Sequence, residues 1–250
     1  MKLVADGISF SYNSHPVLSN ASFSIGKGEM SCILGVNGAG KSTLLKCLNR
    51  ILSPNRGTVL LEGEALSGMR RVEVARRIGY VPQRHSDTAM SVFETVLMGR
   101  TPHMGWKAGP ADYGVVEDIL QRLELAPLSM RRLCDLSGGQ LQKVVIARAL
   151  AQTPKILLLD EPTSSLDLKN QLEVMGLIRD ISMIQGISTV IAIHDLNIAI
   201  RFADRFLFLK KGQVHSVSDQ NTLSAEVIRQ VYGVEVALTQ IEGHTVVVPV

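Results

Sequence analysis

The stretch Gly35-Val36-Asn37-Gly38-Ala39-Gly40-Lys41-Ser42 decides how this chain folds. It fits the phosphate-loop pattern G-x-x-x-x-G-K-[ST], in which a glycine-rich turn joins a buried strand to a helix. Both neighbours of the turn are present, because an apolar run at 30–34 precedes it and a helical pattern at 42–48 follows it. The sequence therefore predicts an α/β fold built around a loop that holds phosphate groups.

The chemistry of this loop depends on its glycines, its lysine and its hydroxyl. Glycines let backbone N–H groups point inward around phosphate oxygens, and the following helix adds its positive N-terminal end. Lys41 would reach the β and γ phosphates of a nucleotide, and the Ser42 hydroxyl would hold Mg²⁺. The alternative, a glycine turn that only caps a helix, is disfavoured by the flanking strand and helix. The candidate nucleotide-binding residues of the loop are Gly35, Asn37, Gly38, Ala39, Gly40, Lys41, Ser42 and Thr43.

Two adjacent carboxylates, Asp160 and Glu161, follow the apolar run at 156–159. This places them at the C-terminal end of a buried strand, where open α/β sheets bind their ligands. Asp160 is the candidate to hold Mg²⁺ through water, because a hard cation prefers oxygen ligands. Glu161 would orient or deprotonate an attacking water. Taken alone, the two carboxylates are more simply explained as the solvated end of a strand. Together with the phosphate loop, they are better explained as ligand-binding residues.

A third motif, Ser137-Gly138-Gly139-Gln140, opens a predicted helix. Its S-x-x-Q pattern is a capping box, and capping is the default interpretation. Glycines in a helix cost about 1 kcal/mol each relative to alanine, so two of them need a further reason. A group that approaches the backbone closely would supply one, and an anion at the helix N-terminus would account for both glycines.

Short apolar strands alternate with helical patterns along most of the chain, which is typical of a parallel sheet covered on both faces. A long, mostly helical region at 84–153 interrupts this alternation. The tail after Gly212 reads as a hairpin, a short helix at 224–232 and a valine-rich extended end whose place is left open. Strands are predicted at 30–34, 57–61, 78–81, 156–159, 188–193 and 206–209, an extended segment at 1–27, and helices at 42–48, from 168 and from 195.

Composition narrows the class of protein. The 250 residues are 46% hydrophobic and 20% charged, which are ordinary globular values and exclude a disordered or collagen-like chain. The net charge of +3 is too weak to indicate a nucleic-acid partner. No apolar run approaches the roughly 18 residues of a membrane helix, residues 1–6 lack a secretory apolar region, and three cysteines show no metal or disulfide spacing. A soluble cytosolic protein is expected.

Leu136-Ser137-Gly138-Gly139-Gln140 resembles the signature motif of the ATP-binding cassette (ABC) family, and its spacing to the Asp160-Glu161 pair matches that family. The resemblance extends over essentially the whole chain. Four other positions match the family: Tyr12 the adenine-stacking aromatic, Gln83 the Q-loop glutamine, Ser165-Leu166-Asp167 the D-loop and His194 the switch histidine. Taken one at a time, each has an ordinary structural explanation, as a strand aromatic, a loop amide, a helix N-cap and a strand-end histidine respectively.

The resemblance implies an α/β fold with a RecA-like P-loop NTPase core, an antiparallel β subdomain and an inserted helical subdomain. The chain would be a single ABC nucleotide-binding domain over 1–250, with the core and β subdomain at 1–83 and 154–250 and the helical subdomain at 84–153. Two copies would form a head-to-tail homodimer with two ATP molecules in the seam. Each site would combine the phosphate loop and Asp160 of one copy with the signature motif of the other.

The implied activity is hydrolysis of ATP with Mg²⁺, a phosphoryl transfer in which positioning and charge stabilisation dominate. Lys41, Mg²⁺ and His194 would neutralise charge on the γ-phosphoryl group while Glu161 aligns the water. Gln83, at the junction with the helical insert, would sense the γ-phosphate and swing that insert. The candidate Mg²⁺ ligands are Ser42, Gln83 and Asp160.

Two weaker resemblances indicate the subfamily. The stretch at 91–100 and the tail at 231–236 resemble importer ATPases for ferric siderophores, haem and cobalamin. Met98, Met104 and Trp106 would be either core or an apolar patch for a membrane partner.

The resemblance further implies partners and a place in the cell. Two separate membrane-embedded permease subunits and an extracytoplasmic substrate-binding protein are expected, with the chain at the cytoplasmic face of the cell membrane and no nucleic acid bound. The alternatives are an exporter ATPase, an ATPase of another importer class, and a soluble cassette ATPase of DNA repair or translation. The segment Arg100-Thr101-Pro102-His103 argues against the exporter, and the low net charge argues against the last.

Overall fold

The computed structural model describes residues 3–83 and 89–250, and its central element is a six-stranded sheet. Its strands are β3 (Met30–Leu34), β6 (Ile78–Val81), β7 (Ile156–Asp160), β8 (Ser188–Ala192), β9 (Arg205–Lys210) and β10 (Gln213–Asp219). The strand order is β10-β9-β3-β8-β7-β6, parallel throughout except for β10, which lies antiparallel to β9 at one edge. Every residue of β3, β7 and β8 is buried, as expected of apolar strands covered on both faces.

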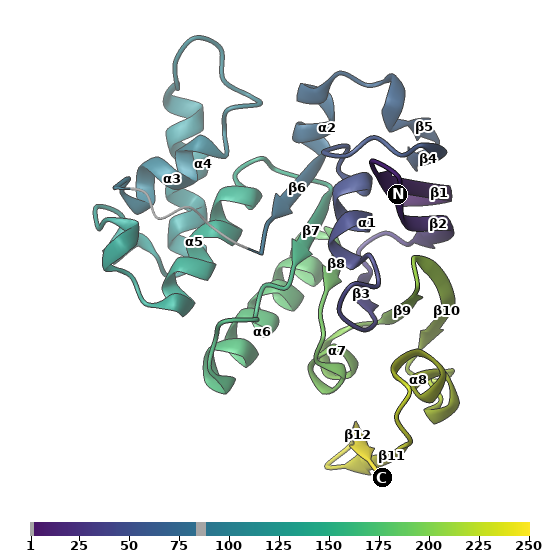
Figure 1. Ribbon diagram of the computed structural model, residues 1–250. Coiled ribbons are helices and arrows are strands. Elements are labelled where there is room, and N and C mark those ends of the chain that lie inside the picture. The colour runs from purple at the N-terminus through teal and green to yellow at the C-terminus, as the bar shows by residue number, and fades with distance from the viewer. Residues whose placement is uncertain (1–2, 84–88) are drawn as a thin grey trace.

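A second, antiparallel sheet lies beside the first (Figure 1). It consists of β1 (Leu3–Tyr12), β2 (His15–Ile25), β4 (Arg56–Leu61) and β5 (Glu64–Ala65), in the order β2-β1-β4-β5. Helix α1 (Lys41–Leu48) packs Leu44, Leu45 and Leu48 into a buried cluster to which both sheets contribute. Because α1 starts at the phosphate loop, this packing fixes the loop between the two sheets.

Helices also cover the opposite face of the six-stranded sheet. Successive residues of β3 alternate between the two faces, so Ile33 belongs to the cluster around α1 while Cys32 and Leu34 belong to the other cluster. That second cluster is closed by α6 (Leu168–Gln185) and α7 (Leu196–Phe202). The strand that leads into the phosphate loop at Leu34 is therefore covered by helices on both faces of the sheet.

Three helices form a separate group at one side of the molecule (Figure 1). They are α3 (Val92–Met98), α4 (Pro110–Arg122) and α5 (Gly138–Leu150), with short 3-10 turns at Ala126–Leu128 and Leu133–Asp135. The buried Arg100 ties the group together, because its guanidinium donates to Asp112 Oδ1 at 3.0 Å and to the Ala151 carbonyl at 2.7 Å. The predicted start of this region at 84 lies outside the described residues, as do Met1 and Lys2.

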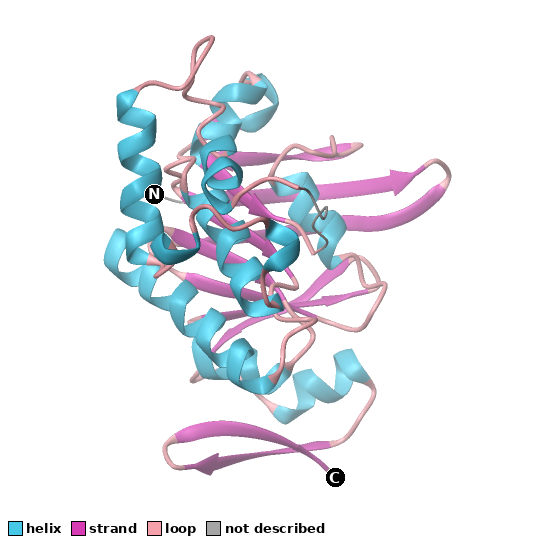
Figure 2. Ribbon diagram, turned by 90° about the vertical axis from the view of Figure 1, so that its left-hand side faces the viewer, coloured by secondary structure: helices cyan, strands magenta, loops and turns pink. Residues whose placement is uncertain are grey.

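The C-terminal segment forms a helix and a separate hairpin, which Figure 2 shows at the lower end of the molecule. These are α8 (Ala225–Tyr232), β11 (Val236–Ile241) and β12 (His244–Pro249). The side chain of Asn197, on α7, accepts from the Val247 N–H at 2.8 Å and donates to the Val247 carbonyl at 3.4 Å. The valine-rich tail, whose place the sequence left open, is therefore fixed to the helix that follows His194.

Helix α2 (Arg71–Arg77), which follows the 3-10 turn Leu66–Gly68, was not predicted from the sequence. Only Val74 of this helix is buried, so the segment has no periodic apolar face to indicate a helix. Its start is stabilised by the Glu73 carboxylate, which accepts from the Arg70 N–H at 2.7 Å. Within the described part of the chain, no helix is both long and apolar enough to cross a bilayer.

Candidate active site

The backbone of the phosphate loop adopts a conformation at Gly40 that favours glycine. Gly40 adopts a φ of +104°, and a Cβ there would lie 3.1 Å from the Val17 carbonyl oxygen. The N–H groups of the first turn of α1 have no partner within their own helix, as in any helix, and here they face the loop. A row of free backbone donors at a helix N-terminus is the arrangement that binds phosphate oxygens.

Lys41 is the charged group of this loop, and its side chain folds back over the loop. The residue is only 6% exposed, and its ammonium donates to the carbonyls of Gly35 at 2.8 Å and Val36 at 3.3 Å. Burial lowers the pKa of Lys41, while the charges of Glu161 and Asp160 act in the opposite direction. An anion that enters the loop would therefore meet a desolvated cation whose ammonium, among the described residues, is hydrogen-bonded to carbonyl oxygens.

A cavity of about 340 Å³ opens over the loop. Tyr12 lies at its rim, is 44% exposed, and packs edge-on against Phe10 with ring centroids 4.8 Å apart. An exposed ring face beside a phosphate-binding loop is a surface on which a nucleotide base can stack. The cavity is lined by Tyr12, Val17, Asn37, Gly38, Gly40, Lys41, Ser42, Thr43 and Glu161.

The hydroxyl of Ser42 and the carboxylate of Asp160 meet at the edge of this cavity. Ser42 Oγ donates to Asp160 Oδ1 at 2.8 Å, and Asp160 is 2% exposed. Two hard oxygen donors in contact fit a Mg²⁺ ion that takes its remaining ligands from water and phosphate. Among residues 3–83 and 89–250, no cluster of three or more His, Cys, Asp or Glu side chains is suited to hold a metal by itself. The chain thus offers a partial coordination shell.

Glu161 occupies the next position and has a left-handed backbone, with a φ of +47°. Its N–H donates to the carbonyl of Ala192 on the neighbouring strand at 2.9 Å, which fixes this conformation. One carboxylate oxygen accepts from Gln83 Nε2 at 2.8 Å and lies 3.8 Å from His194 Nδ1. Residues far apart in the sequence are therefore assembled around one carboxylate at the C-terminal edge of the sheet.

Gln83 contacts this carboxylate instead of the Ser42–Asp160 pair. Its amide nitrogen donates to Glu161, and Gln83 does not line the cavity over the loop. Its role as a Mg²⁺ ligand stays a prediction. The hydrogen bond does place Gln83, where β6 ends, directly on the residue predicted to handle water.

The motif Ser137-Gly138-Gly139-Gln140 lies on a different part of the chain. Ser137 Oγ accepts from the Gln140 N–H at 3.3 Å and the Gln140 side chain accepts from the Ser137 N–H at 3.1 Å, which is the predicted capping box. A Cβ on Gly139 would lie 2.4 Å from Asn170 Oδ1 of α6, so the second glycine also permits close packing within the chain. None of the four residues lines the cavity over the phosphate loop.

Comparison with known proteins decides the family. A family model described as "ABC transporter" matches residues 18–164. The chain belongs to the ABC transporter family. An ABC transporter ATP-binding protein of Methanocaldococcus jannaschii is 48% identical over 100% of this chain and 98% of its own length.

Two further relatives of this ABC protein are named as import subunits. The phosphonates import ATP-binding protein PhnC of Nitratidesulfovibrio vulgaris is 40% identical over 88% of this chain and 86% of its own. The petrobactin import ATP-binding protein FpuC of Bacillus anthracis is 35% identical over 89% and 84%. The predicted resemblance to importer ATP-binding subunits is confirmed, whereas the substrates named for the relatives differ.

Solved structures support the same family assignment. An inward-facing ABC transporter described as of metal-chelate type matches with a TM-score of 0.86 at 33% identity, over 99% of this chain and 96% of the other. A dimeric ATP-binding cassette bound to ADP and phosphate after hydrolysis matches with a TM-score of 0.76 at 28% identity, over 87% and 98%. The predicted RecA-like P-loop fold and the predicted ATPase activity are confirmed.

Two residues of this ABC ATPase that contact candidate site residues were missed by sequence reasoning. Tyr80 on β6 donates to Asp160 Oδ2 at 3.3 Å, and burial, followed by the charge of Asp160, raises the pKa of Tyr80. Asn170 fills the space beside Gly139 and also contacts the N-cap Asp167 through its N–H at 2.8 Å. A tyrosine in a short apolar strand and an asparagine in a helix carry no local signal of such contacts.

Proposed function

We propose that this ABC ATPase energises the import of a metal chelate of the iron-siderophore, haem or cobalamin type. The observation that carries the proposal is the similarity to a metal-chelate type transporter over 99% of the chain. The petrobactin relative supports the same substrate class. The phosphonate relative, at 40% identity, makes phosphonate import the competing assignment.

In the proposed mechanism, the residues around the loop divide the chemistry of ATP hydrolysis. Ser42 and Asp160 would hold a Mg²⁺ ion, which would supply charge neutralisation at the phosphate oxygens. Lys41 exchanges its carbonyl partners for phosphate oxygens, a stronger charge-assisted contact. Glu161 accepts a proton from, or orients, the attacking water. His194, whose Nδ1 lies 3.8 Å from that carboxylate, would contact the γ-phosphoryl group.

We further propose that the signature motif serves the site of a second copy. Its four residues are absent from the lining of their own chain's cavity, yet Ser137 and Gln140 are exposed or half-exposed at a helix N-terminus that favours anions. A head-to-tail homodimer would bring that helix end to the γ-phosphate bound in the partner.

Replacement of Ser137 by arginine tests this arrangement. We expect Ser137→Arg to abolish ATP hydrolysis and to leave ATP binding by the dilute monomer nearly unchanged, because the bulky cation blocks the seam and not the phosphate loop. ATPase assays and equilibrium binding of a fluorescent ATP analogue measure the two effects. Ser67→Arg, at an exposed serine outside the site, is the matched control. Loss of ATP binding by the monomer would contradict the proposal and assign Ser137 to its own chain's site.

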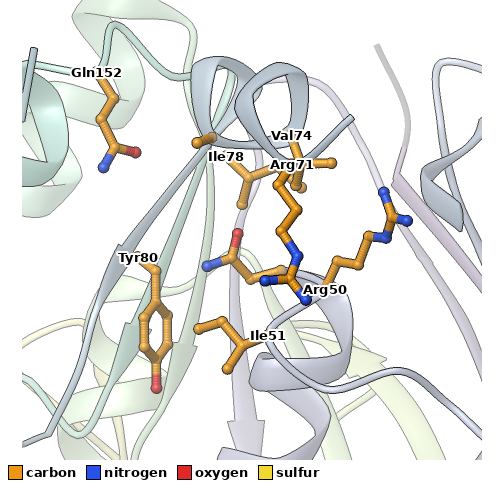
Figure 3. Close-up of a pocket in the computed structure, with 9 residues that line it drawn as sticks. Arg50, Ile51, Arg71, Val74, Ile78, Tyr80 and Gln152 are labelled. Atoms are coloured by element: carbon orange, nitrogen blue, oxygen red, sulfur yellow. The ribbon is translucent and has the colours of Figure 1, made fainter. Parts of the chain in front are cut away.

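Permease subunits that couple to ATP hydrolysis need a binding surface whose residues contact the candidate site. A groove of about 350 Å³ lies between the end of α1, helix α2 and strand β6, and Figure 3 shows the side chains that surround it. Tyr80 lines this groove, and its hydroxyl contacts Asp160. A permease segment in the groove would thus touch a residue that contacts a proposed Mg²⁺ ligand. We therefore propose this groove as the permease contact, with the ATPase held at the cytoplasmic face of the membrane.

Reconstitution tests the proposed function. The chain is expected to co-purify with a polytopic permease, and the complex in proteoliposomes should take up radiolabelled ferric siderophore, haem or cobalamin in an ATP-dependent manner when a binding protein is present. Uptake of a radiolabelled phosphonate, measured in parallel, is the competing outcome. ATP-dependent phosphonate uptake with no uptake of the three chelates would overturn the substrate assignment.

A further inference from the structure

Trp106 is the most exposed large apolar side chain among the described residues. It stands in the loop at 101–109 between α3 and α4, with Gly105 before it and the exposed Lys107 after it. A single exposed apolar residue is ordinary on a protein surface. Trp106 differs from such a residue because its loop is held at both ends and lies beside basic side chains.

The base of this loop is firmly attached. Arg100, at its start, is 8% exposed and pairs with Asp112 through side chains that are 10% and 13% exposed. His103 Nε2 lies 2.8 Å from the Gln152 carbonyl, and Asp112 Oδ2 accepts from the Gly109 N–H at 3.0 Å. Both ends of the loop are thus fixed, and the tip that bears Trp106 projects from a defined base.

The loop is also joined to helix α2. Arg76 Nε donates to the Pro102 carbonyl at 2.8 Å. Figure 1 shows the loop above α4 at the upper end of the molecule, the end at which α2 also lies, with the C-terminal hairpin at the opposite end. The loop at 101–109 therefore lies on the same side of the molecule as the groove beside α2.

This side of the molecule is basic. The segment 68–77 contains four arginines and one acid, Glu73, and the loop 101–109 adds Lys107 and no acid. Acids on this side are paired with cations: Glu73 with Arg70 at 3.1 Å, Glu64 with Arg77 at 2.8 Å, and Asp112 with Arg100 at 3.0 Å. The exposed side chains of Arg76, which contacts this loop, and of Lys107, which follows Trp106, add positive charge at the loop that bears the tryptophan.

We propose that Trp106 and this basic surface bind the anionic headgroup layer of the membrane. Tryptophan is enriched at the membrane–water interface, where its ring is accommodated among headgroups, and neighbouring Lys and Arg are attracted by anionic lipids. The anionic surface of the cytoplasmic leaflet is complementary in charge to this loop surface, which lies outside the groove proposed for the permease. The inference rests on the proposed function, because only a membrane-bound ATPase would present this side to lipid.

Because Trp106 is the single tryptophan of the chain, its fluorescence reports directly on the proposed contact. Full-length protein is mixed with vesicles of phosphatidylcholine alone or of phosphatidylcholine with phosphatidylglycerol. We expect a blue shift and increased intensity with the anionic vesicles only, reversed by raised ionic strength. No shift with anionic vesicles would overturn the inference, and a shift seen only when permease is present in nanodiscs would assign the contact to protein.

Sedimentation with the same vesicles provides the mutational test. Trp106→Ala and Lys107→Ala should each lower the affinity for anionic vesicles, the latter by about fivefold, while Met183→Ala, at an exposed methionine of α6, should change nothing. Basal ATP hydrolysis and thermal stability of all three variants should match the parent protein. Co-purification with a permease combined with no vesicle binding would remove only this inference. Vesicle binding by a chain that co-purifies with no permease would instead remove the proposed coupling to a permease and keep the lipid contact.

Discussion

Replacement of Glu161 by glutamine is expected to slow ATP hydrolysis by about 10²- to 10⁴-fold, the usual contribution of a general base. The substitution keeps the shape of the side chain and removes the carboxylate that contacts Gln83 and lies near His194. Binding of ATP and Mg²⁺ should stay within a few-fold of the parent protein, because Glu161 is not in the phosphate loop. Phosphate release and equilibrium nucleotide binding give the two quantities.

The same variant should also reveal the dimer. If ATP closes two copies and hydrolysis reopens them, a block at the chemical step lets the ATP-bound dimer accumulate by mass action. Size-exclusion chromatography with multi-angle light scattering should show a dimer with ATP and a monomer with ADP. Glu117→Gln, at an exposed glutamate of α4, is the control. Hydrolysis at the parental rate by Glu161→Gln would remove Glu161 from the proposed role.

Replacement of Lys41 by alanine is expected to weaken ATP binding by about 100-fold and to reduce turnover to the background of the assay. Hydrogen bonds to charged groups contribute about 1.5–3 kcal/mol each, and the ammonium of Lys41 can donate several to the phosphates. Lys46→Ala, on the same helix but outside the cavity lining, should bind ATP normally. Thermal unfolding of both variants shows whether the fold is intact. Binding of ATP by Lys41→Ala within a few-fold of the parent protein would contradict the assignment.

The parts of the fold that depend on local pattern could be predicted from the sequence. The strand at Met30–Leu34, the glycine turn and the helix after it carry their own signals, because burial, turn and helix periodicity are all local in sequence. Helix α2 was missed because its one buried residue, Val74, gives no periodic face. The terminal hairpin could not be placed because it is held by Asn197, 50 residues before Val247.

In the candidate site, too, the residues in local motifs could be predicted from the sequence, and the contacts between distant residues could not. The phosphate loop and the carboxylates were found by pattern and spacing. The structure places Ser42 and Glu161 in the lining of one cavity, with Asp160 buried against Ser42. Tyr80 was missed because its contact with Asp160 joins residues 80 positions apart. The glycines of the signature motif were interpreted through an external anion, whereas the close neighbour of Gly139 within the chain is Asn170. Contacts between residues that are far apart in the sequence depend on the tertiary fold, so a local sequence pattern does not indicate them.

The left-handed backbone of Glu161 has a consequence for protein engineering. A residue other than glycine in this region stores about 1 kcal/mol or more of strain, which glycine would relieve. Under the proposed mechanism the chain keeps this strain because the position needs a carboxylate. A design procedure that ranks substitutions by thermostability alone would therefore favour glycine at the very position where the reaction requires an acid, and it would produce a sturdier protein that has lost its activity.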